Sequence, residues 1–319
     1  MGRYNRNLPP ANRAPIQESA KRGFPLRPGQ VVTTHGRTVV VEDARGILAK
    51  CSLRRKLGRA VCGDKVLWRP TTHNQGVVES IDRGHGLLER RGAGGHHKPL
   101  AANVDQIIIT SASHPPLSEN LIDSYLVAAE LIGAESVILI NKSDLLDEQQ
   151  QAGMAVRLKD YFRIGYPVLF CNTRLAHGTD ELVESLQERT SIFVGQSGVG
   201  KSSLIRSLLP DQKIRISKLS SATGLGRHTT SNTTLYHLSA NSHLIDSPGV
   251  RDFQLWQVAP NQVADGFREF QHYLGQCRFH NCLHRGEPGC AIQAAVDKGD
   301  VSERRLKSYR KLAKRLEEK

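Results

Sequence analysis

The feature that most constrains the fold is the order of two nucleotide-binding motifs. Residues 195–202 read GQSGVGKS and stand between the apolar segment SIFV and a helical segment, which is the context of a phosphate-binding loop. Residues 141–144 read NKSD and follow the apolar segment VILI. The Asp144 carboxylate could accept hydrogen bonds from the N1–H and the exocyclic amine of guanine, donors that adenine lacks there. In an ordinary P-loop GTPase the phosphate loop comes first, whereas here it comes second.

A circular permutation reconciles this order with one fold. Near-continuous apolar segments alternate with amphipathic ones from about residue 104 to residue 247. This alternation predicts a doubly wound α/β sheet that is covered on both faces. Starting the chain at Ser191 restores the usual motif order, with each motif at the carboxyl end of a strand and all of them lining one crevice. We therefore predict a circularly permuted α/β P-loop GTPase domain over residues 92–252, with 92–103 as a glycine-rich linker into it.

Each motif has an expected role toward GTP and Mg²⁺. Lys201 would reach the β- and γ-phosphates, and the Ser202 hydroxyl would ligate Mg²⁺. Asp246, in the motif DSPG, would hold Mg²⁺ through water, with the Gly249 N–H facing the γ-phosphate. A glycine-rich turn and a polar turn are the alternatives for the phosphate loop and the NKSD segment. The expected GTP-binding residues are Asn141, Lys142, Ser143, Asp144, Cys171, Asn172, Thr173, Gly195, Gln196, Ser197, Gly198, Val199, Gly200, Lys201, Ser202, Ser203, Asp246 and Gly249.

The segment GLGRHTTSNTT, before the strand that leads to Asp246, has the position of a switch loop. It offers His228 as a candidate catalytic residue and Thr229 or Thr230 as a Mg²⁺ and γ-phosphate contact. An ordinary solvated histidine is the alternative for His228. Val250 occupies the place where many GTPases have a water-orienting glutamine, so we expect slow intrinsic turnover that a partner accelerates.

The N-terminal third indicates a polyanionic partner. Residues 1–28 form a basic, apolar-poor arm that cannot bury a core, and residues 29–91 have the short alternating strands of an OB-type β-barrel. Trp68 offers a stacking face among the basic residues of this barrel. The chain carries a net charge of +13, which favours nucleic acid, and RNA in particular for such a barrel. A charged surface that serves only solubility is the alternative. The basic residues of the barrel are Arg37, Lys50, Arg54, Arg55, Lys56, Arg59, Lys65 and Arg69.

The C-terminal section, residues 253–319, contains a cysteine cluster and ends in a basic helix with an apolar stripe. Cys277, Cys282, His284 and Cys290 have the spacing C-x₄-C-x-H-x₅-C. Three thiolates and one imidazole make a closed tetrahedral zinc site, which is structural because no position is left for water. His280 lies outside this pattern, and free thiols are the alternative. We predict a mainly helical zinc-binding domain.

The chain has no apolar run of the roughly 18 residues that span a bilayer, and its first residues lack the apolar core of a secretory signal. We therefore expect a cytoplasmic protein with reduced cysteines and no membrane partner.

Together the barrel, the permuted motif order, GLGRHTT, DSPGVRDF and the cysteine cluster resemble one family, the circularly permuted GTPases that depend on the small ribosomal subunit (RsgA, also called YjeQ). The resemblance covers nearly the whole chain. It implies an OB-fold that contacts ribosomal RNA, a structural zinc ion, and hydrolysis of GTP to GDP and phosphate that the small subunit stimulates. The family acts in late maturation of that subunit and helps to release other assembly factors. We expect a monomer.

The family's proposed catalytic histidine maps onto His228. The following run is TTS where relatives often carry three threonines, so the choice between Thr229 and Thr230 for Mg²⁺ stays open. Two other functions compete with a GTPase switch: a GTP-gated RNA-binding scaffold with incidental hydrolysis, and an ATP-dependent kinase or ATPase. The NKSD motif argues against the second.

Overall fold

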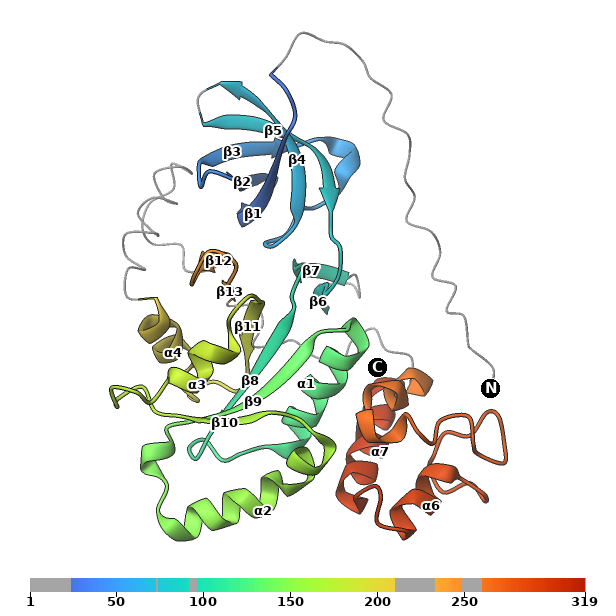
Figure 1. The fold of residues 1–319 in the computed structure, drawn as a ribbon. Coiled ribbons are helices and arrows are strands. Elements are labelled where there is room, and N and C mark those ends of the chain that lie inside the picture. The colour runs from blue at the N-terminus through green and yellow to red at the C-terminus, as the bar shows by residue number, and fades with distance from the viewer. Residues whose placement is uncertain (1–23, 73, 92–96, 210–232, 248–259, 319) are drawn as a thin grey trace.

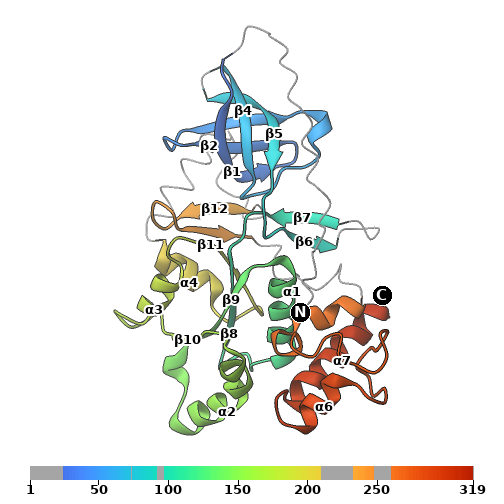
Figure 2. The same cartoon turned by 45° about the vertical axis from the view of Figure 1, so that its right-hand side comes forward.

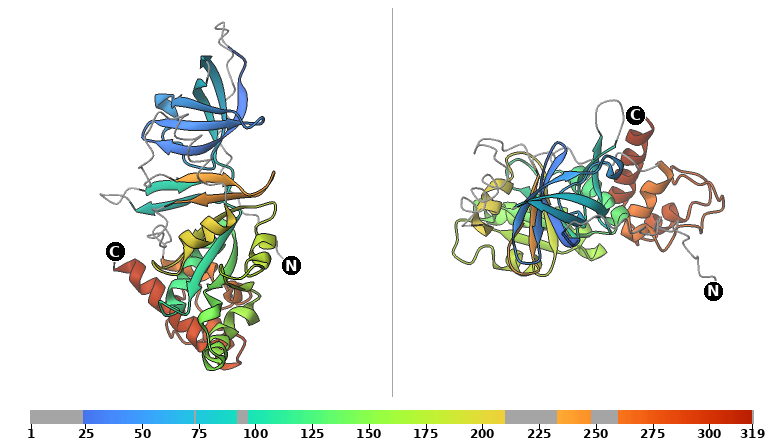
Figure 3. Two further views of the ribbon diagram at one scale, coloured as in Figure 1. Left: turned by 90° about the vertical axis from the view of Figure 1, so that its left-hand side faces the viewer. Right: turned by 90° about the horizontal axis from the view of Figure 1, so that it is seen from above.

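The computed structural model describes residues 24–72, 74–91, 97–209, 233–247 and 260–318. A β-barrel lies at one end of an elongated molecule, an α/β unit follows it, and a helical C-terminal unit packs beside the α/β unit (Figures 1 and 3). The expected position of His228, Thr229, Thr230, Gly249 and Val250 lies outside the described residues, as does most of the basic arm.

The central unit has the predicted doubly wound architecture. Its parallel strands lie in the order β10-β9-β8-β11-β13, and β12 pairs antiparallel with β13. These strands are β8 (Gln106–Ala112), β9 (Glu135–Asn141), β10 (Val168–Cys171), β11 (Thr190–Val194), β12 (Thr234–His237) and β13 (His243–Asp246). Every residue of β8 is buried, as expected for a strand that is covered on both faces.

Two pairs of helices cover the two faces of this sheet. Helices α1 (Glu119–Ile132) and α2 (Glu148–Ile164) share one apolar core with one face. Helices α3 (Asp180–Ser185) and α4 (Lys201–Leu208) share a second core with the other face. Because the strands are parallel, the segments that follow them meet at one edge of the sheet.

Five strands close the N-terminal barrel in the order β1-β2-β3-β5-β4, with β4 returning to pair with β1. They are β1 (Arg27–His35), β2 (Thr38–Asp43), β3 (Leu48–Leu53), β4 (Lys65–Thr72) and β5 (Gln75–Asp82), and a 3₁₀ turn (Arg55–Leu57) follows β3. The stacking role expected of Trp68 is wrong. Its side chain is only 3% exposed in the barrel core, against Gly29 and Gly76, and no base could stack on it there.

Part of the predicted linker is a strand. Residues His97–Ala101 form β7, which pairs with β6 (Leu88–Arg91) between the barrel and the α/β unit (Figure 2). The glycines of 92–96 suggested a linker, but Leu100 and Ala101 are apolar and buried in the core of the α/β unit. Burial of these two side chains offsets the entropy of ordering the segment.

The C-terminal unit consists of 3₁₀ turns, η5 (Pro260–Gly266) and η6 (Arg268–Phe270), and helices α6 (Ala291–Asp297) and α7 (Glu303–Glu317). The predicted apolar stripe of α7 is buried at Leu306, Tyr309 and Leu312. Tyr309 meets Phe267 edge to face, with ring centroids 5.7 Å apart. These side chains belong to the same core as α1, so the unit is packed onto the α/β unit.

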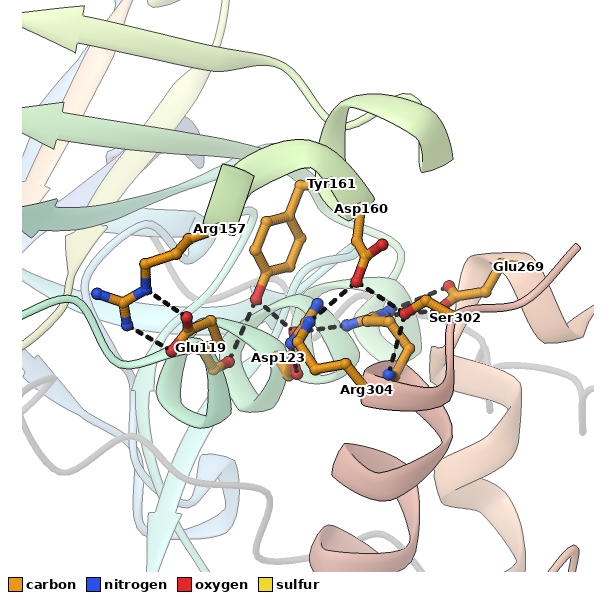
Figure 4. A network of polar contacts seen from close by, with 9 residues as sticks. Glu119, Asp123, Arg157, Asp160, Tyr161, Glu269, Ser302 and Arg304 are labelled. Atoms are coloured by element: carbon orange, nitrogen blue, oxygen red, sulfur yellow. Dashed lines mark hydrogen bonds and ion pairs between the residues drawn. The ribbon is translucent and has the colours of Figure 1, made fainter. Parts of the chain in front are cut away.

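A polar network reinforces this attachment (Figure 4). The Arg305 side chain is fully buried and donates to Asp123 Oδ1 of α1 at 2.6 Å and to Glu269 at 2.5 and 3.0 Å. Arg304 donates to Asp123 Oδ2 and to Asp160 of α2, both at 2.9 Å. Charge-assisted hydrogen bonds thus join α7 to α1 and α2 of the α/β unit and to η6.

Candidate nucleotide site and metal centre

The predicted nucleotide motifs converge at one edge of the sheet. The base-recognition segment, residues 141–144, begins at the last residue of β9, and the second base loop, residues 171–173, begins at the last residue of β10. The phosphate loop follows β11, and Asp246 ends β13. Because these strands are parallel and adjacent, their carboxyl ends face the same side. The permuted order along the chain is therefore compatible with a single crevice.

The phosphate loop wraps around the ammonium group of Lys201. Lys201 is the first residue of α4. Its Nζ donates to the carbonyl oxygens of Gly195 and Gln196, both at 2.6 Å. Gly200 has a φ of +97°, and a Cβ there would collide with the Asn141 amide. Glycine at position 200 thus allows the base-recognition segment to approach the loop closely.

Asn141 and Lys142 attach the base-recognition segment to the phosphate loop. The buried Asn141 Nδ2 donates to the Val199 carbonyl at 2.8 Å. Lys142 Nζ donates to the carbonyl oxygens of Gly198 at 2.7 Å and His114 at 3.1 Å. These bonds fix the distance between the part of the site expected to hold phosphate and the part expected to hold the base.

A cavity of about 220 Å³ lies beside this junction. Its lining residues are Asn141, Lys142, Asp144, Leu145, Asn172, Thr173, Arg174, Gly200 and Ser203. The second base loop is fixed by its own bonds: Asn172 Oδ1 accepts from the Arg174 N–H at 2.9 Å, and Ser143 Oγ donates to the Cys171 carbonyl at 3.2 Å. Burial raises the pKa of the Cys171 thiol to about 11, so this thiol is neutral at physiological pH.

Sequence reasoning missed two contributors to the site. Arg174 lines the cavity, and its Nη1 lies 3.7 Å from Asp144 Oδ2. The segment after β8 contributes the His114 carbonyl, and Pro115 lies close to Gly198. Both could have been found from the rule that every parallel strand ends at the crevice, since Arg174 and His114 follow the ends of β10 and β8.

Two segments flank the expected γ-phosphate position: the switch loop, residues 224–234, and the segment that begins at Asp246, residues 246–249. We call them the two switch segments, and their described ends meet near Asp246. Thr233 precedes β12, and Ser247 directly follows Asp246. Their hydroxyl groups lie 2.9 Å apart, within hydrogen-bonding distance. The segment that carries His228 in the sequence therefore re-enters the described structure beside the residue expected to hold Mg²⁺ through water.

The four predicted metal ligands gather in the C-terminal unit. Their ligand atoms all lie within 4.8 Å of one another. His284 Nδ1 is 3.5 Å from the sulfurs of Cys277 and Cys290 and 3.6 Å from that of Cys282. Tetrahedral zinc, with Zn–S of about 2.3 Å and Zn–N of about 2.0–2.1 Å, places sulfur about 3.6 Å from nitrogen. The residues present thus fit a zinc ion.

Surrounding groups hold the ligand loop in shape. The Glu287 carboxylate accepts backbone N–H bonds from Leu283 at 2.9 Å and Arg285 at 2.6 Å. Burial opposes its ionisation, but the backbone N–H donors outweigh burial and lower its pKa to about 2. Tyr309 and Arg310 of α7 donate to the carbonyls of Leu283 and His284. His280 is exposed and does not join the cluster.

The basic residues predicted for the barrel are at its surface. Arg37, Lys50, Arg55, Lys56 and Arg59 are exposed. Arg54 is exposed, Arg69 is half-buried, and both pair with Glu79. The exposed cations could contact a polyanion. Within the part of the chain that the structure describes, no helix combines the length and apolar character needed to cross a bilayer.

Comparison with known proteins gives consistent matches. Residues 81–256 match the model of the family described as RsgA GTPase. The chain is 49% identical over 290 residues to the small ribosomal subunit biogenesis GTPase RsgA of Chromohalobacter salexigens, with 90% of this chain and 85% of the relative covered. It is 43% identical over 297 residues to the small ribosomal subunit biogenesis GTPase RsgA 1 of Vibrio vulnificus, with 92% of this chain and 84% of the relative covered.

Two solved structures share the fold. The crystal structure of YjeQ from Thermotoga maritima matches with a TM-score of 0.75 and 32% identity, over 91% of this chain and 98% of that one. YloQ, described as a circularly permuted GTPase, matches with a TM-score of 0.72 and 24% identity, over 94% and 98%. With the permuted order of the nucleotide motifs, these matches establish that the chain belongs to the RsgA GTPase family of GTP-hydrolysing enzymes.

Proposed function

We propose that this protein is a GTP-dependent maturation factor of the small ribosomal subunit, whose turnover of GTP to GDP and phosphate is stimulated by that subunit. The observation that carries the nucleotide assignment is the attachment of Asn141 and Lys142 to the phosphate loop beside the cavity that Asp144 lines. The names of the relatives support the ribosomal role.

Within the site, we assign base recognition to Asn141–Asp144 with Cys171, Asn172 and Thr173, and phosphate binding to Gly195–Ser203. Ser202 and Asp246 would hold Mg²⁺, together with Thr229 or Thr230, and Gly249 would face the γ-phosphate. When bound, Mg²⁺ neutralises charge on the phosphates. His228 is the proposed catalytic residue.

The remaining parts have supporting roles in this proposal. The barrel, residues 29–91, would contact ribosomal RNA through its exposed cations, and the basic arm, residues 1–28, would add to that contact. Residues 92–252 would form the GTPase domain. Residues 253–319 would form a domain that one structural zinc ion stabilises. We place the protein in the cytoplasm as a monomer that acts alongside other assembly factors.

The test is GTP turnover measured with purified small subunits, with large subunits and free RNA as controls. We expect stimulation by small subunits only. Stimulation by all three would show a response to RNA charge alone. GTP-dependent binding to small subunits without stimulation would instead favour the scaffold function, and indifference to every partner would remove the ribosomal role.

A further inference from the structure

Strand β1 pairs with strands of both the barrel and the α/β unit. Its first half, residues 27–30, pairs with β4 and closes the barrel. Beyond that point Thr33 pairs with Thr234 of β12, so the barrel and the α/β unit form one eleven-stranded sheet. The first half of the β1 edge is thus used by the barrel and the second half by the α/β unit.

A β-bulge at Val32 makes this change of partner possible. In the pairing with β2, Val31 lies opposite Val41 and Thr33 opposite Val40, so Val32 is the extra residue. Bulges re-aim the side chains that follow them. Val31 lies in the core of the barrel, whereas Val32 lies in the core of the α/β unit. The bulge marks the point at which β1 passes from one unit to the other.

Thr33 connects the barrel to the ends of both switch segments. Its side chain is 3% exposed, and its Oγ1 donates to the Thr233 carbonyl at 3.0 Å. Thr233 Oγ1 lies 2.9 Å from Ser247 Oγ. In the sequence Thr233 follows the segment with His228, Thr229 and Thr230, and Ser247 follows Asp246. A continuous chain of hydrogen bonds thus runs from the barrel to the flanks of the proposed catalytic segments.

The other end of β12 is attached to the barrel as well. Glu42 Oε2, at the end of β2, lies 2.6 Å from His237 Nε2. The hairpin of β12 and β13 is therefore held at both ends of β12, and displacement of the barrel would move Thr233 with it. The His237 side chain is 36% exposed, so this pair contributes less than the buried bond of Thr33.

We infer that Thr33 is a positioning residue for GTP hydrolysis: through Thr233 and Ser247 it fixes the flanks of the two switch segments relative to the phosphate loop. The inference rests on the proposed GTPase site. Thr33 contacts neither the base-recognition segment nor the phosphate loop. Loss of its hydroxyl should therefore lower the rate of the hydrolytic step and leave nucleotide affinity unchanged.

The test compares three variants of the full chain in single-turnover GTP hydrolysis without ribosomes. Thr33→Val replaces the hydroxyl with a methyl group and keeps the side chain β-branched, whereas Thr33→Ser keeps the hydroxyl and loses the methyl group. Thr34→Val is the matched control, since Thr34 is the next residue of the same strand and faces Val39. One hydrogen bond is worth about 0.5–1.5 kcal/mol, so we expect Thr33→Val to hydrolyse GTP about threefold to tenfold more slowly. Thr33→Ser and Thr34→Val should keep the parent rate, and all three should bind GDP and GTP like the parent.

Ser247→Ala breaks the same chain of bonds from the other side and provides the test if Thr33→Val does not fold. It should also slow hydrolysis, and in the double variant the two effects should not multiply, because both remove one connection. A parent rate in Thr33→Val, an equal defect in Thr33→Ser, or fully multiplicative effects would overturn the inference while leaving the proposed function intact. A parent that turns over GTP without responding to small subunits would remove the ribosomal role and leave this inference standing.

Discussion

At the scale of single residues, the choice of base depends on Asp144. Its carboxylate lines the cavity and is 24% exposed, so a base can reach it. The sequence predicts this role because the motif and its place after a strand are local features. The end of β10 places Arg174 at the crevice by the same rule, but its approach to Asp144 could not be predicted, because it depends on how β9 and β10 pair.

Replacing Asp144 with Asn should change the preferred nucleotide. The Asn amide still accepts one hydrogen bond through Oδ1 but sets its N–H₂ donor against the other guanine donor. We therefore expect GTP affinity to fall about 100-fold and affinity for xanthosine triphosphate, which has an acceptor there, to rise. Titration of both nucleotides by fluorescence or calorimetry measures this. Asp180→Asn is the control: its carboxylate is exposed on α3 and does not line the cavity, so GTP affinity should change by less than about threefold. Unchanged GTP affinity in Asp144→Asn would contradict the base assignment.

Asp64 gives the barrel a pH dependence. Its side chain is fully buried, Oδ2 accepts from the Val61 N–H at 2.7 Å, and Arg83 Nε lies 3.5 Å from Oδ1. Burial raises the pKa of this carboxyl to about 6, although the Val61 N–H and Arg83 oppose the rise. The folded state therefore binds more protons than the unfolded state between about pH 4, the ordinary range of Asp, and the folded pKa. The barrel should gain stability as pH falls through this window.

The variant Asp64→Asn should remove this gain. Between pH 7 and pH 4.5 the free energy of unfolding of the parent barrel should rise relative to that of Asp64→Asn by about 2 kcal/mol. Trp68, in the barrel core, reports unfolding selectively when the other tryptophan is removed by Trp256→Phe. Parallel pH profiles for parent and variant would show that Asp64 does not titrate in this range.

At the scale of elements, local signals predicted the alternation of strands and helices, and a local signal also sets the start of α2. This helix begins at Glu148 because Asp147 and Gln150 form a capping box there. Residues Ser143–Leu145 instead form a 3₁₀ turn, which leaves Asp144 at the cavity. The strand β7 was missed because its pairing with β6 is not visible in the residues of either segment.

Zinc should be required for the order of the ligand loop. We expect one zinc ion per chain by mass spectrometry, and its loss in Cys282→Ser, since three ligands leave the site incomplete. Chelation should lower the hydrogen-exchange protection of α6, which begins directly after Cys290, while leaving that of β8 unchanged. His280→Ala is the control and should keep its zinc. Stoichiometric zinc in Cys282→Ser would rule out the proposed ligand set.

At the scale of the whole molecule, the contacts that join the units were invisible in the sequence. Thr33 and Thr233 lie 200 positions apart, and Arg305 and Asp123 lie 182 apart. The sequence placed Arg305 in a strongly cationic helix, and only tertiary packing shows that its guanidinium is fully buried. Periodicity predicted the buried stripe of α7, but a periodic pattern does not identify the elements that cover the stripe.

Arg305 should therefore be essential for attachment of the C-terminal unit. Arg305→Met fills similar space but leaves the carboxylates of Asp123 and Glu269 buried without their main partner, which typically costs about 3–5 kcal/mol. We expect α7 to lose hydrogen-exchange protection while β8 and β9 keep theirs. Lys307→Ala, at an exposed ion pair two residues further along the same helix, should have no such effect. Adding Asp123→Asn to Arg305→Met should restore part of the protection, because it removes a buried charge. Equal protection of α7 in parent and Arg305→Met would mean that apolar packing of Phe267, Phe270 and Tyr309 is sufficient for attachment.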